Sequence, residues 1–309
     1  MKLNLALRTL LIGVTAVFLE TSTQAADDAH TGDSPQAEVA TIERRIEGRL
    51  GVLALDTSTG RQIEYRATER FPMCSTFKLL LAGAVLSHVD KHQEDLNRRI
   101  SYEESDLLEY APIAKQHVQE GGMTVSALCA AAIEYSDNTA ANLLLQSIGG
   151  PSKLTEYLRS IGDDVTRLDR NEPSLNTAIA ADPRDTATPA SMLKSMKALL
   201  LDGALSENSR QQLAEWLVGN TTGGNRLRAG LPADCRIGDK TGTGQNGATN
   251  DVGIVWPPSR SPMLIVTFLV GTKAESAERD AAIAEVARIV ADSLGFSETN
   301  ARGSSSLDR

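Results

Sequence analysis

Segments with strand character lie at both ends of the chain, and the stretch between them is helical in pattern. Residues 50–55 and 62–66 flank a turn-forming sequence, and strand-like runs return at residues 236–240, 251–256 and 263–270. Strands from the two ends can share a sheet only if the helical stretch is an insertion. The sequence therefore predicts an α+β fold: an antiparallel sheet formed from both chain ends and flanked by helices, plus an inserted all-helical region, with the active site in the cleft between them.

The helices are placed by apolar periodicity and by their end signals. Thr188-Pro189 has proline at the first helical position, and Thr124 has the position of a cap. The expected helices cover residues 39–48, 76–88, 124–133, 139–148, 151–161, 189–201, 206–218 and 274–294. We expect one domain at residues 26–309, with its sheet-containing part at about 37–66 and 221–296 and its helical part at about 67–220.

The first 25 residues have the pattern of a secretory signal peptide. Lys2 and Arg8 make a positive start, residues 10–19 are apolar, and Thr23-Gln24-Ala25 offers small residues for cleavage. The apolar run is too short for a membrane anchor, and no later stretch reaches ~18 consecutive apolar residues. We expect a periplasmic protein that is soluble and monomeric once the signal peptide is removed.

The net charge of -9 argues against a nucleic-acid partner, because nucleic-acid binding needs a basic face. The three cysteines, Cys74, Cys129 and Cys235, are odd in number, so at least one thiol is free. Two of them can pair, or all three can be small buried apolar side chains, and we favour the second interpretation.

Ser75 and Lys78 are three residues apart at the start of an apolar helix. Side chains at this spacing share a helix face, and a serine hydroxyl needs a neighbouring base to become a nucleophile. A buried lysine with a lowered pKa is such a base. The pattern recurs at Ser191 and Lys194, inside a predicted helix where it needs no function. The local pattern alone does not separate the two serines.

Two further stretches carry groups suited to the same chemistry. In Ser136-Asp137-Asn138, the hydroxyl can pass a proton to a leaving nitrogen and the amide can orient a carbonyl or an amine. These residue types are also ordinary helix caps. Lys240-Thr241-Gly242, followed by Thr243, comes at the end of a predicted strand. It can hold a carboxylate beside the strand edge, or it is a solvated turn.

Glu172 lies in Glu172-Pro173-Ser174-Leu175-Asn176, within an irregular stretch at residues 167–185. Long irregular loops in compact domains are often functional. Glu172 can act as a general base while Asn176 helps it to hold a water. The alternative is an ordinary surface acid.

Ser-x-x-Lys, Ser-Asp-Asn and Lys-Thr-Gly occur together in the order typical of class A β-lactamases and penicillin-binding proteins. From about Ala37 to Leu294, the chain resembles a class A serine β-lactamase. The segment Glu-Pro-x-x-x-Asn, which separates β-lactamases from transpeptidases, is present. The resemblance implies hydrolysis of the β-lactam amide of antibiotics through a serine acyl-enzyme, β-lactam resistance, and no cofactor or metal.

The resemblance also implies roles. Ser75 attacks the lactam carbonyl, and the N–H groups of Ser75 and Thr243 form the oxyanion hole. Either Lys78 or Glu172 accepts the Ser75 proton. Ser136 protonates the leaving nitrogen, and Glu172 activates the water that releases the acyl group. The implied substrate-binding residues are Tyr110, Asn138, Asn176, Lys240, Thr241, Gly242 and Arg226.

This chain departs from many relatives at Thr249, where they carry an arginine that helps to hold the substrate carboxylate. Arg226 matches a position that some carbapenem-hydrolysing relatives use instead, so we expect it to supply the charge. The two disulfides known among carbapenemases would need cysteines at Gly244 or at Ala82, so neither can form.

The loop that carries Glu172 needs a clamp, and by resemblance Arg167 or Arg170 pairs with Asp185. The family also suggests a cis peptide at Glu172-Pro173, in keeping with the preference of proline.

Three other classes remain open. A penicillin-binding or peptidase-like enzyme would lack deacylation by Glu172, and a non-catalytic β-lactam sensor would not turn over. A zinc hydrolase could use His88 and His92, whose spacing can grip a metal on a helix. No glutamate follows the first histidine, so the zinc-protease motif is absent.

Overall fold

The computed structural model describes residues 34–296, and the predicted signal peptide at residues 1–25 lies outside this range. The helices are α1 Pro35–Ile46, α2 Phe77–Asp90, α3 Ala114–His117, α4 Val125–Glu134, α5 Asn138–Ser147, α6 Pro151–Ser160, α7 Pro189–Leu200, α8 Glu207–Val218, α9 Leu227–Gly230 and α10 Ser276–Leu294. The strands are β1 Arg49–Asp56, β2 Gln62–Tyr65, β3 Phe71–Pro72, β4 Arg99–Ile100, β5 Met123–Thr124, β6 Thr186–Ala187, β7 Arg236–Thr243, β8 Thr249–Trp256 and β9 Met263–Val270.

Five strands form one antiparallel sheet in the order β2-β1-β9-β8-β7. The two ends of the chain meet inside this sheet, where Leu50 of β1 faces Leu269 of β9. Strand β7 is at one edge, so its outer side is free for other contacts. The predicted α+β fold, with an antiparallel sheet flanked by helices, is confirmed.

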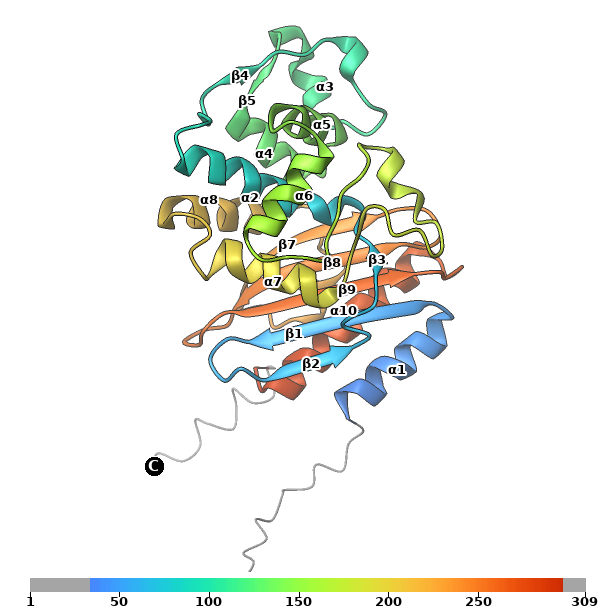
Figure 1. Ribbon diagram of the computed structural model, residues 1–309. Helices are drawn as coiled ribbons and strands as arrows, with labels where there is room; N and C mark the ends of the chain where they lie inside the picture. Colours follow the sequence, from blue (N-terminus) through green and yellow to red (C-terminus); the bar gives the residue numbers. More distant parts are fainter. Residues whose placement is uncertain (1–33, 297–309) are drawn as a thin grey trace, which may run out of the picture. The chain divides into compact units, whose positions relative to one another are not determined.

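Helices cover both faces of the sheet, with α1 and α10 below it and the other long helices above (Figure 1). The strand side chains alternate accordingly, because successive residues of a strand point to opposite faces. Val52 and Ala54 pack with α1 and α10. Leu53 and Leu55 belong to the larger core formed with the remaining helices. Each fully buried leucine or valine contributes about 1.5–3 kcal/mol to folding.

Helix α2 is the central helix of the larger core. Its residues are buried without a break from Phe77 to Ser87, so it has no polar stripe. A helix that is apolar on all sides is a core helix. Helices α4, α5, α6 and α8 pack against it. This packing fixes the position of the residues that precede its first turn.

Several expected boundaries differ in the structure, and two of the differences have a clear physical reason. Strand β7 continues past Lys240 to Thr243, because its pairing with β8 continues to Thr243 opposite Thr249. The Lys-Thr-Gly segment is therefore edge strand and not a turn. Helix α1 begins at Pro35, earlier than predicted, because the Ser34 side chain accepts a hydrogen bond from the Ala37 N–H.

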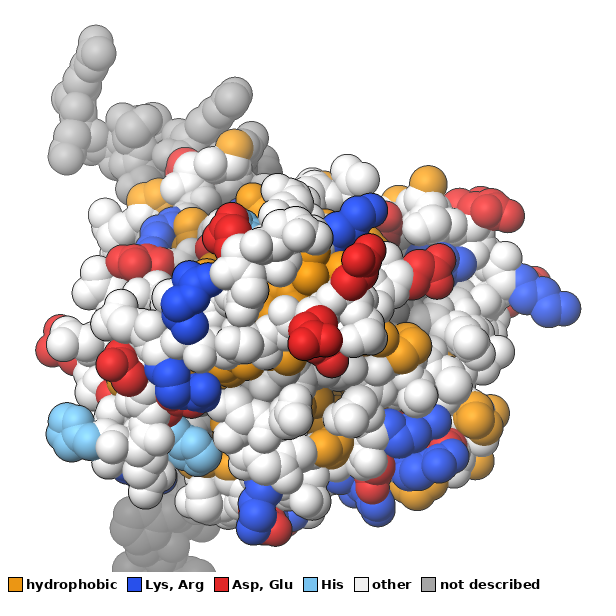
Figure 2. All heavy atoms as spheres, turned by 90° about the horizontal axis from the view of Figure 1, so that it is seen from above, with side chains coloured by type: hydrophobic (Ala, Val, Ile, Leu, Met, Phe, Trp, Pro, Cys, Tyr) orange, Lys and Arg blue, Asp and Glu red, His pale blue; other side chains and the backbone are white. Residues whose placement is uncertain are grey.

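Figure 2 views the molecule from the end that lies at the top of Figure 1. Acidic and basic side chains alternate on this face, with apolar atoms between them. Within residues 34–296, no helix combines the length and the apolarity needed to cross a membrane.

Candidate active site

Ser75 lies in a short 3-10 turn, Cys74–Thr76, that leads into α2. Cys74 has a positive φ of 47°, and the Thr76 hydroxyl donates a hydrogen bond of 2.8 Å to the Met73 carbonyl. The turn leaves Ser75 only 7% exposed. Its Oγ donates a hydrogen bond of 3.2 Å to Oε1 of Glu172, 97 residues away in sequence. A carboxylate that can accept the serine proton is thus within direct reach.

Lys78 is fully buried, and its ammonium group bridges three segments of the chain. Nζ donates hydrogen bonds to the Ser136 carbonyl at 2.8 Å and to Asn138 Oδ1 at 2.6 Å, and it lies 3.0 Å from Glu172 Oε1. An ammonium group has three N–H donors, and these acceptors share them with Ser136 Oγ at 3.4 Å. Burial lowers the pKa of Lys78, while the Glu172 charge opposes this shift. Ser75 and Lys78 are thus linked through Glu172 Oε1.

Glu172 is held at both its backbone and its carboxylate. Asn142 on α5 accepts a hydrogen bond from the Glu172 N–H at 3.0 Å and donates one to its carbonyl at 2.9 Å. Asn176 Nδ2 donates to Glu172 Oε2. The other amide atom of Asn176, Oδ1, is buried and has no partner among the described residues. An unpaired acceptor beside a carboxylate is suited to holding a water.

Asp185 closes the loop that carries Glu172. Its Oδ1 accepts hydrogen bonds from the N–H groups of Asp169 at 2.7 Å and Arg170 at 2.9 Å. Its Oδ2 lies 2.5 Å from Arg170 Nε. Of the two expected arginines, Arg170 therefore makes this clamp, whereas Arg167 pairs with Asp169. The peptide bond between Glu172 and Pro173 is cis, as expected.

Strand β7 passes very close to the turn that holds Ser75. A Cβ atom added to Gly242 would lie 2.7 Å from the Met73 carbonyl oxygen and 3.2 Å from the Ser75 nitrogen. Only glycine allows this approach without movement of the backbone. The edge strand and the nucleophile turn therefore form two sides of one site.

Lys240 belongs to this strand, and its side chain reaches Ser136. Lys240 is fully buried, and its Nζ donates hydrogen bonds to Ser136 Oγ at 3.1 Å and to the Thr241 carbonyl at 2.9 Å. Burial, together with the nearby charge of Lys78, lowers the pKa of Lys240 to about 7. Lys78 Nζ lies 3.4 Å from the same Ser136 Oγ. The hydroxyl thus stands between two ammonium groups that can replace a proton it gives away.

Arg226 reaches the end of β7 from the segment before α9. It forms an ion pair of 2.7 Å with Asp280 and donates to the Gly242 and Asn250 carbonyls at 3.1 and 2.8 Å. Its Nη2 donates to Thr243 Oγ1 at 2.9 Å. The guanidinium is therefore fixed beside the strand edge. Thr249 is buried and accepts a hydrogen bond of 2.9 Å from Arg279.

These residues surround a cleft of about 330 Å³. Its lining residues are Ser75, Tyr110, Ser136, Asn138, Asn176, Thr222, Arg226, Thr241, Gly242 and Thr243. Lys78, Glu172 and Lys240 lie buried behind this lining. Tyr110, the one aromatic residue among these ten lining residues, is 52% exposed. The structure thus brings all twelve predicted site residues to one place.

Three contact residues were missed from the sequence. Asn142 lies four residues after Asn138 on α5, a spacing that could have indicated a shared face. Thr222 bonds to the Thr241 hydroxyl at 2.5 Å, and Asp280 holds Arg226. Neither lies in a pattern that would have singled it out.

Within the described residues, the serine and the lysine of the second Ser-x-x-Lys copy make only contacts that support the fold. Ser191 forms a capping box with Thr188 at the start of α7, and Lys194 bonds to the Gly162 carbonyl. All three cysteines are free; Cys74 and Cys129 are buried as expected, but Cys235 is only partly buried, so the expectation of three buried side chains was wrong for Cys235. A Cβ added at Gly244 would lie 2.6 Å from Cys74 Sγ. Position 244, which would need a cysteine for the first of the two disulfides considered above, is therefore adjacent to Cys74. In residues 34–296, no three His, Cys, Asp or Glu side chains are grouped as metal ligands.

A serine next to a carboxylate and a buried lysine, in a cleft bordered by an edge strand, can support acyl transfer. A model of the β-lactamase enzyme family matches residues 34–294. β-Lactamase OXY-1 of Klebsiella oxytoca is 46% identical over 264 residues, which are 85% of this chain and 90% of that protein. β-Lactamase CTX-M-97 of Escherichia coli is 47% identical over 258 residues, 84% of this chain and 88% of that protein.

Solved structures give the same result. An ancestral class A β-lactamase (GNCA) is 58% identical with a TM-score of 0.83, covering 84% of this chain and 100% of the other. The putative class A β-lactamase PenP from Rhodopseudomonas palustris is 52% identical with a TM-score of 0.83 and the same coverage. The chain belongs to the β-lactamase enzyme family, and the predicted resemblance to its class A members is confirmed.

Proposed function

We propose that the protein hydrolyses the amide bond of β-lactam antibiotics through an acyl-enzyme on Ser75, and that it confers resistance to them. The observation that carries the proposal is the hydrogen bond of 3.2 Å between Ser75 Oγ and Glu172 Oε1. One carboxylate then serves both steps: it receives the serine proton, returns it to Lys78, 3.0 Å away, once that lysine has given a proton to Ser136, and as a carboxylate again it activates the water that frees the serine.

Glu172 is the first proton acceptor in this proposal. Lys78 already donates its three N–H groups to Ser136, Asn138 and Glu172, so as an ammonium it has no lone pair to offer. Its charge instead stabilises the negative charge that develops nearby. Because burial lowers its pKa, Lys78 can replace Glu172 when that carboxylate is removed.

Ser136 delivers a proton to the lactam nitrogen as it leaves, and Lys240 or Lys78 restores that proton through the hydrogen bonds at 3.1 and 3.4 Å. The N–H groups of Ser75 and Thr243 stabilise the oxyanion. One such donor is typically worth about 3 kcal/mol in the transition state.

Deacylation uses a water held by Glu172 and by the unpaired Oδ1 of Asn176. The substrate carboxylate binds at the edge of β7, where Lys240, Thr241, Gly242 and Thr243 are joined by Arg226. Asn138 receives the side-chain amide of the substrate, and Tyr110 borders the cleft mouth.

The protein acts without a cofactor or metal on small-molecule β-lactams, without a nucleic-acid partner, as a periplasmic monomer released from its signal peptide. We propose that the domain is divided into a sheet-containing part at about 37–66 and 221–296 and a helical part at about 67–220.

The test is turnover of a chromogenic cephalosporin in large excess over enzyme. We expect many turnovers by the wild type, at most one by Glu172→Gln and none by Ser75→Ala. Ser191→Ala is the matched control, because it removes the serine of the second motif copy and should retain activity. A single turnover by the wild type would indicate a penicillin-binding enzyme or a sensor, and loss of activity with a chelator would indicate a zinc hydrolase.

A further inference from the structure

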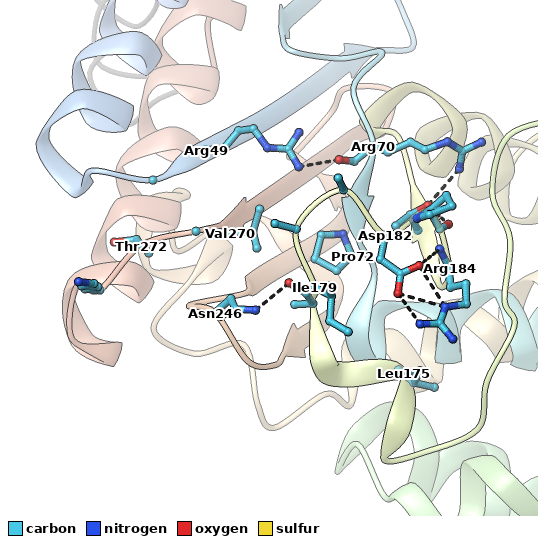
Figure 3. Close-up of a pocket in the computed structure, with 18 of the residues that line it drawn as sticks. Arg49, Arg70, Pro72, Leu175, Ile179, Asp182, Arg184, Asn246, Val270 and Thr272 are labelled. Carbon is cyan, nitrogen blue, oxygen red and sulfur yellow. Dashed lines mark hydrogen bonds and ion pairs between the residues drawn. The ribbon is translucent and has the colours of Figure 1, made fainter.

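A cavity of about 890 Å³ lies behind the loop that carries Glu172, and the active-site cleft is smaller, at about 330 Å³. The cavity is bounded by loop residues on one side and by the ends of β1 and β9 on the other (Figure 3). Leu175 lines this cavity, whereas its neighbour Asn176 lines the cleft. The loop is therefore a wall with a separate space on each side.

One part of the cavity wall is apolar. Pro72, Leu175, Ile179 and Val270 contribute to it. Ile179 is 52% exposed, which makes it one of three large hydrophobic side chains that are exposed in the described chain. Apolar surface left in water favours a ligand that covers it, by roughly 25 cal/mol per Å².

The other part of the wall is basic. Arg49, Arg70, Arg170, Arg184 and Lys273 line the cavity, with Glu47 and Asp182 as its only acidic side chains. Asp185 and Glu69, just outside the lining, pair with Arg170 and Arg49, so the five basic residues face four acidic ones and a small positive excess remains, in a chain whose net charge is -9. Such an excess in a concave wall attracts anions.

Two of these basic groups are available to a ligand. Arg170 and Arg184 are paired with Asp185 and Asp182, and Arg49 is paired with Glu69. Arg70 donates one hydrogen bond to Thr186 and has no ion pair within residues 34–296, and Lys273 has neither.

We propose that this cavity is a second ligand site, which takes a small anion with an apolar body: a carboxylate or sulfonate on an aromatic ring or alkyl chain. The anionic group lies near Lys273, and the apolar body covers Ile179 and Pro72. The volume is in the range of cavities that enclose drug-sized ligands. The proposal does not depend on β-lactam hydrolysis.

The experiment titrates the protein with 8-anilinonaphthalene-1-sulfonate and, in parallel, with its uncharged analogue N-phenyl-1-naphthylamine. We expect saturable binding of the sulfonate that is at least about tenfold tighter than that of the analogue and weakens with salt. Equal affinity for the two dyes would overturn the proposal.

Two variants locate the site, and a third is the matched control. Lys273→Glu and Ile179→Asp should each weaken sulfonate binding about tenfold, because one reverses a charge and the other exposes a carboxylate on the apolar wall. Arg288→Glu makes the same charge reversal on α10, outside the cavity, and should leave binding unchanged. Unaltered binding in the first two variants, or an equal loss in the third, would contradict the proposal.

A competition experiment separates the natural sources of such anions. Decanoate represents a fatty acid, and hydrolysed benzylpenicillin represents a reaction product. Displacement of the dye by either one supports the site and names the source. Failure of both to displace it would refute binding of carboxylates.

Discussion

Asp185→Ala removes the clamp of the loop that carries Glu172. The Asp185 side chain is 1% exposed, and the change removes an ion pair and two backbone hydrogen bonds at Asp169 and Arg170. Breaking a buried ion pair costs about 3–5 kcal/mol. Because the Arg170 side chain keeps 19% exposure and can be partly hydrated, we expect the lower end, about 3 kcal/mol. The midpoint of thermal unfolding should fall by about 6 °C or more.

The kinetic effect should be unequal. Acylation can use Lys78 when Glu172 is displaced, since both groups belong to the same hydrogen-bond cluster, but deacylation has no second base. Stopped-flow acylation and single-turnover deacylation should show deacylation slowed at least about tenfold more than acylation, as a displacement near 1 Å can cost about 10²-fold.

Asp182→Ala is the control, because Asp182 pairs with the half-exposed Arg184 in the same loop and makes no contact with Glu172. It should leave both rates nearly unchanged. Equal slowing of acylation and deacylation in Asp185→Ala would refute the reasoning that this loop acts mainly on deacylation.

Three further changes address the substrate side of the site. Arg226→Ala should raise KM for penicillins and weaken inactivation by clavulanate about tenfold, and unchanged values would remove Arg226 from carboxylate binding. Burial lowers the pKa of Lys240 to about 7, so this group is charged below pH 7 and neutral above it. We therefore expect kcat/KM for anionic substrates to fall as pH rises through about 7. In Lys240→Arg, whose side chain stays charged, this fall should be absent. A fall that persists in the variant would assign the titration to another group. Gly242→Ala should lower kcat/KM by about 10²-fold, because the added Cβ would press on Met73 and Ser75; wild-type kinetics would show that the strand can shift freely.

Much of the fold follows from local pattern. Helices α4 and α7 begin where Thr124 and Thr188-Pro189 predicted a helix start, since capping is a contact between neighbouring residues. The sheet was predictable because both chain ends carry apolar runs of strand length. The end of β7 was misjudged because its continuation depends on pairing with β8, which the sequence of β7 alone does not contain.

The residues of the candidate site could be predicted where they lie in short sequence motifs. Ser75 could be separated from Ser191 only by the other motifs, and the structure adds a local reason, since Ser191 is used as a cap. Asn142 and Asp280 act through contacts across 30 and 54 residues of sequence, for which no periodic pattern exists. The order of proton transfer could not be predicted from the sequence. It follows from the positions of the acceptors around Lys78, and only the folded chain defines these positions.

The central claim is that Ser75 forms an acyl-enzyme that Glu172 releases. Intact-protein mass spectrometry after mixing with benzylpenicillin tests it directly, with the modified peptide identified by digestion. We predict that Glu172→Gln accumulates one covalent adduct on the peptide containing Ser75, while the wild type returns to its unmodified mass as the drug is consumed. No adduct on Glu172→Gln, or an adduct on a peptide without Ser75, would contradict the account.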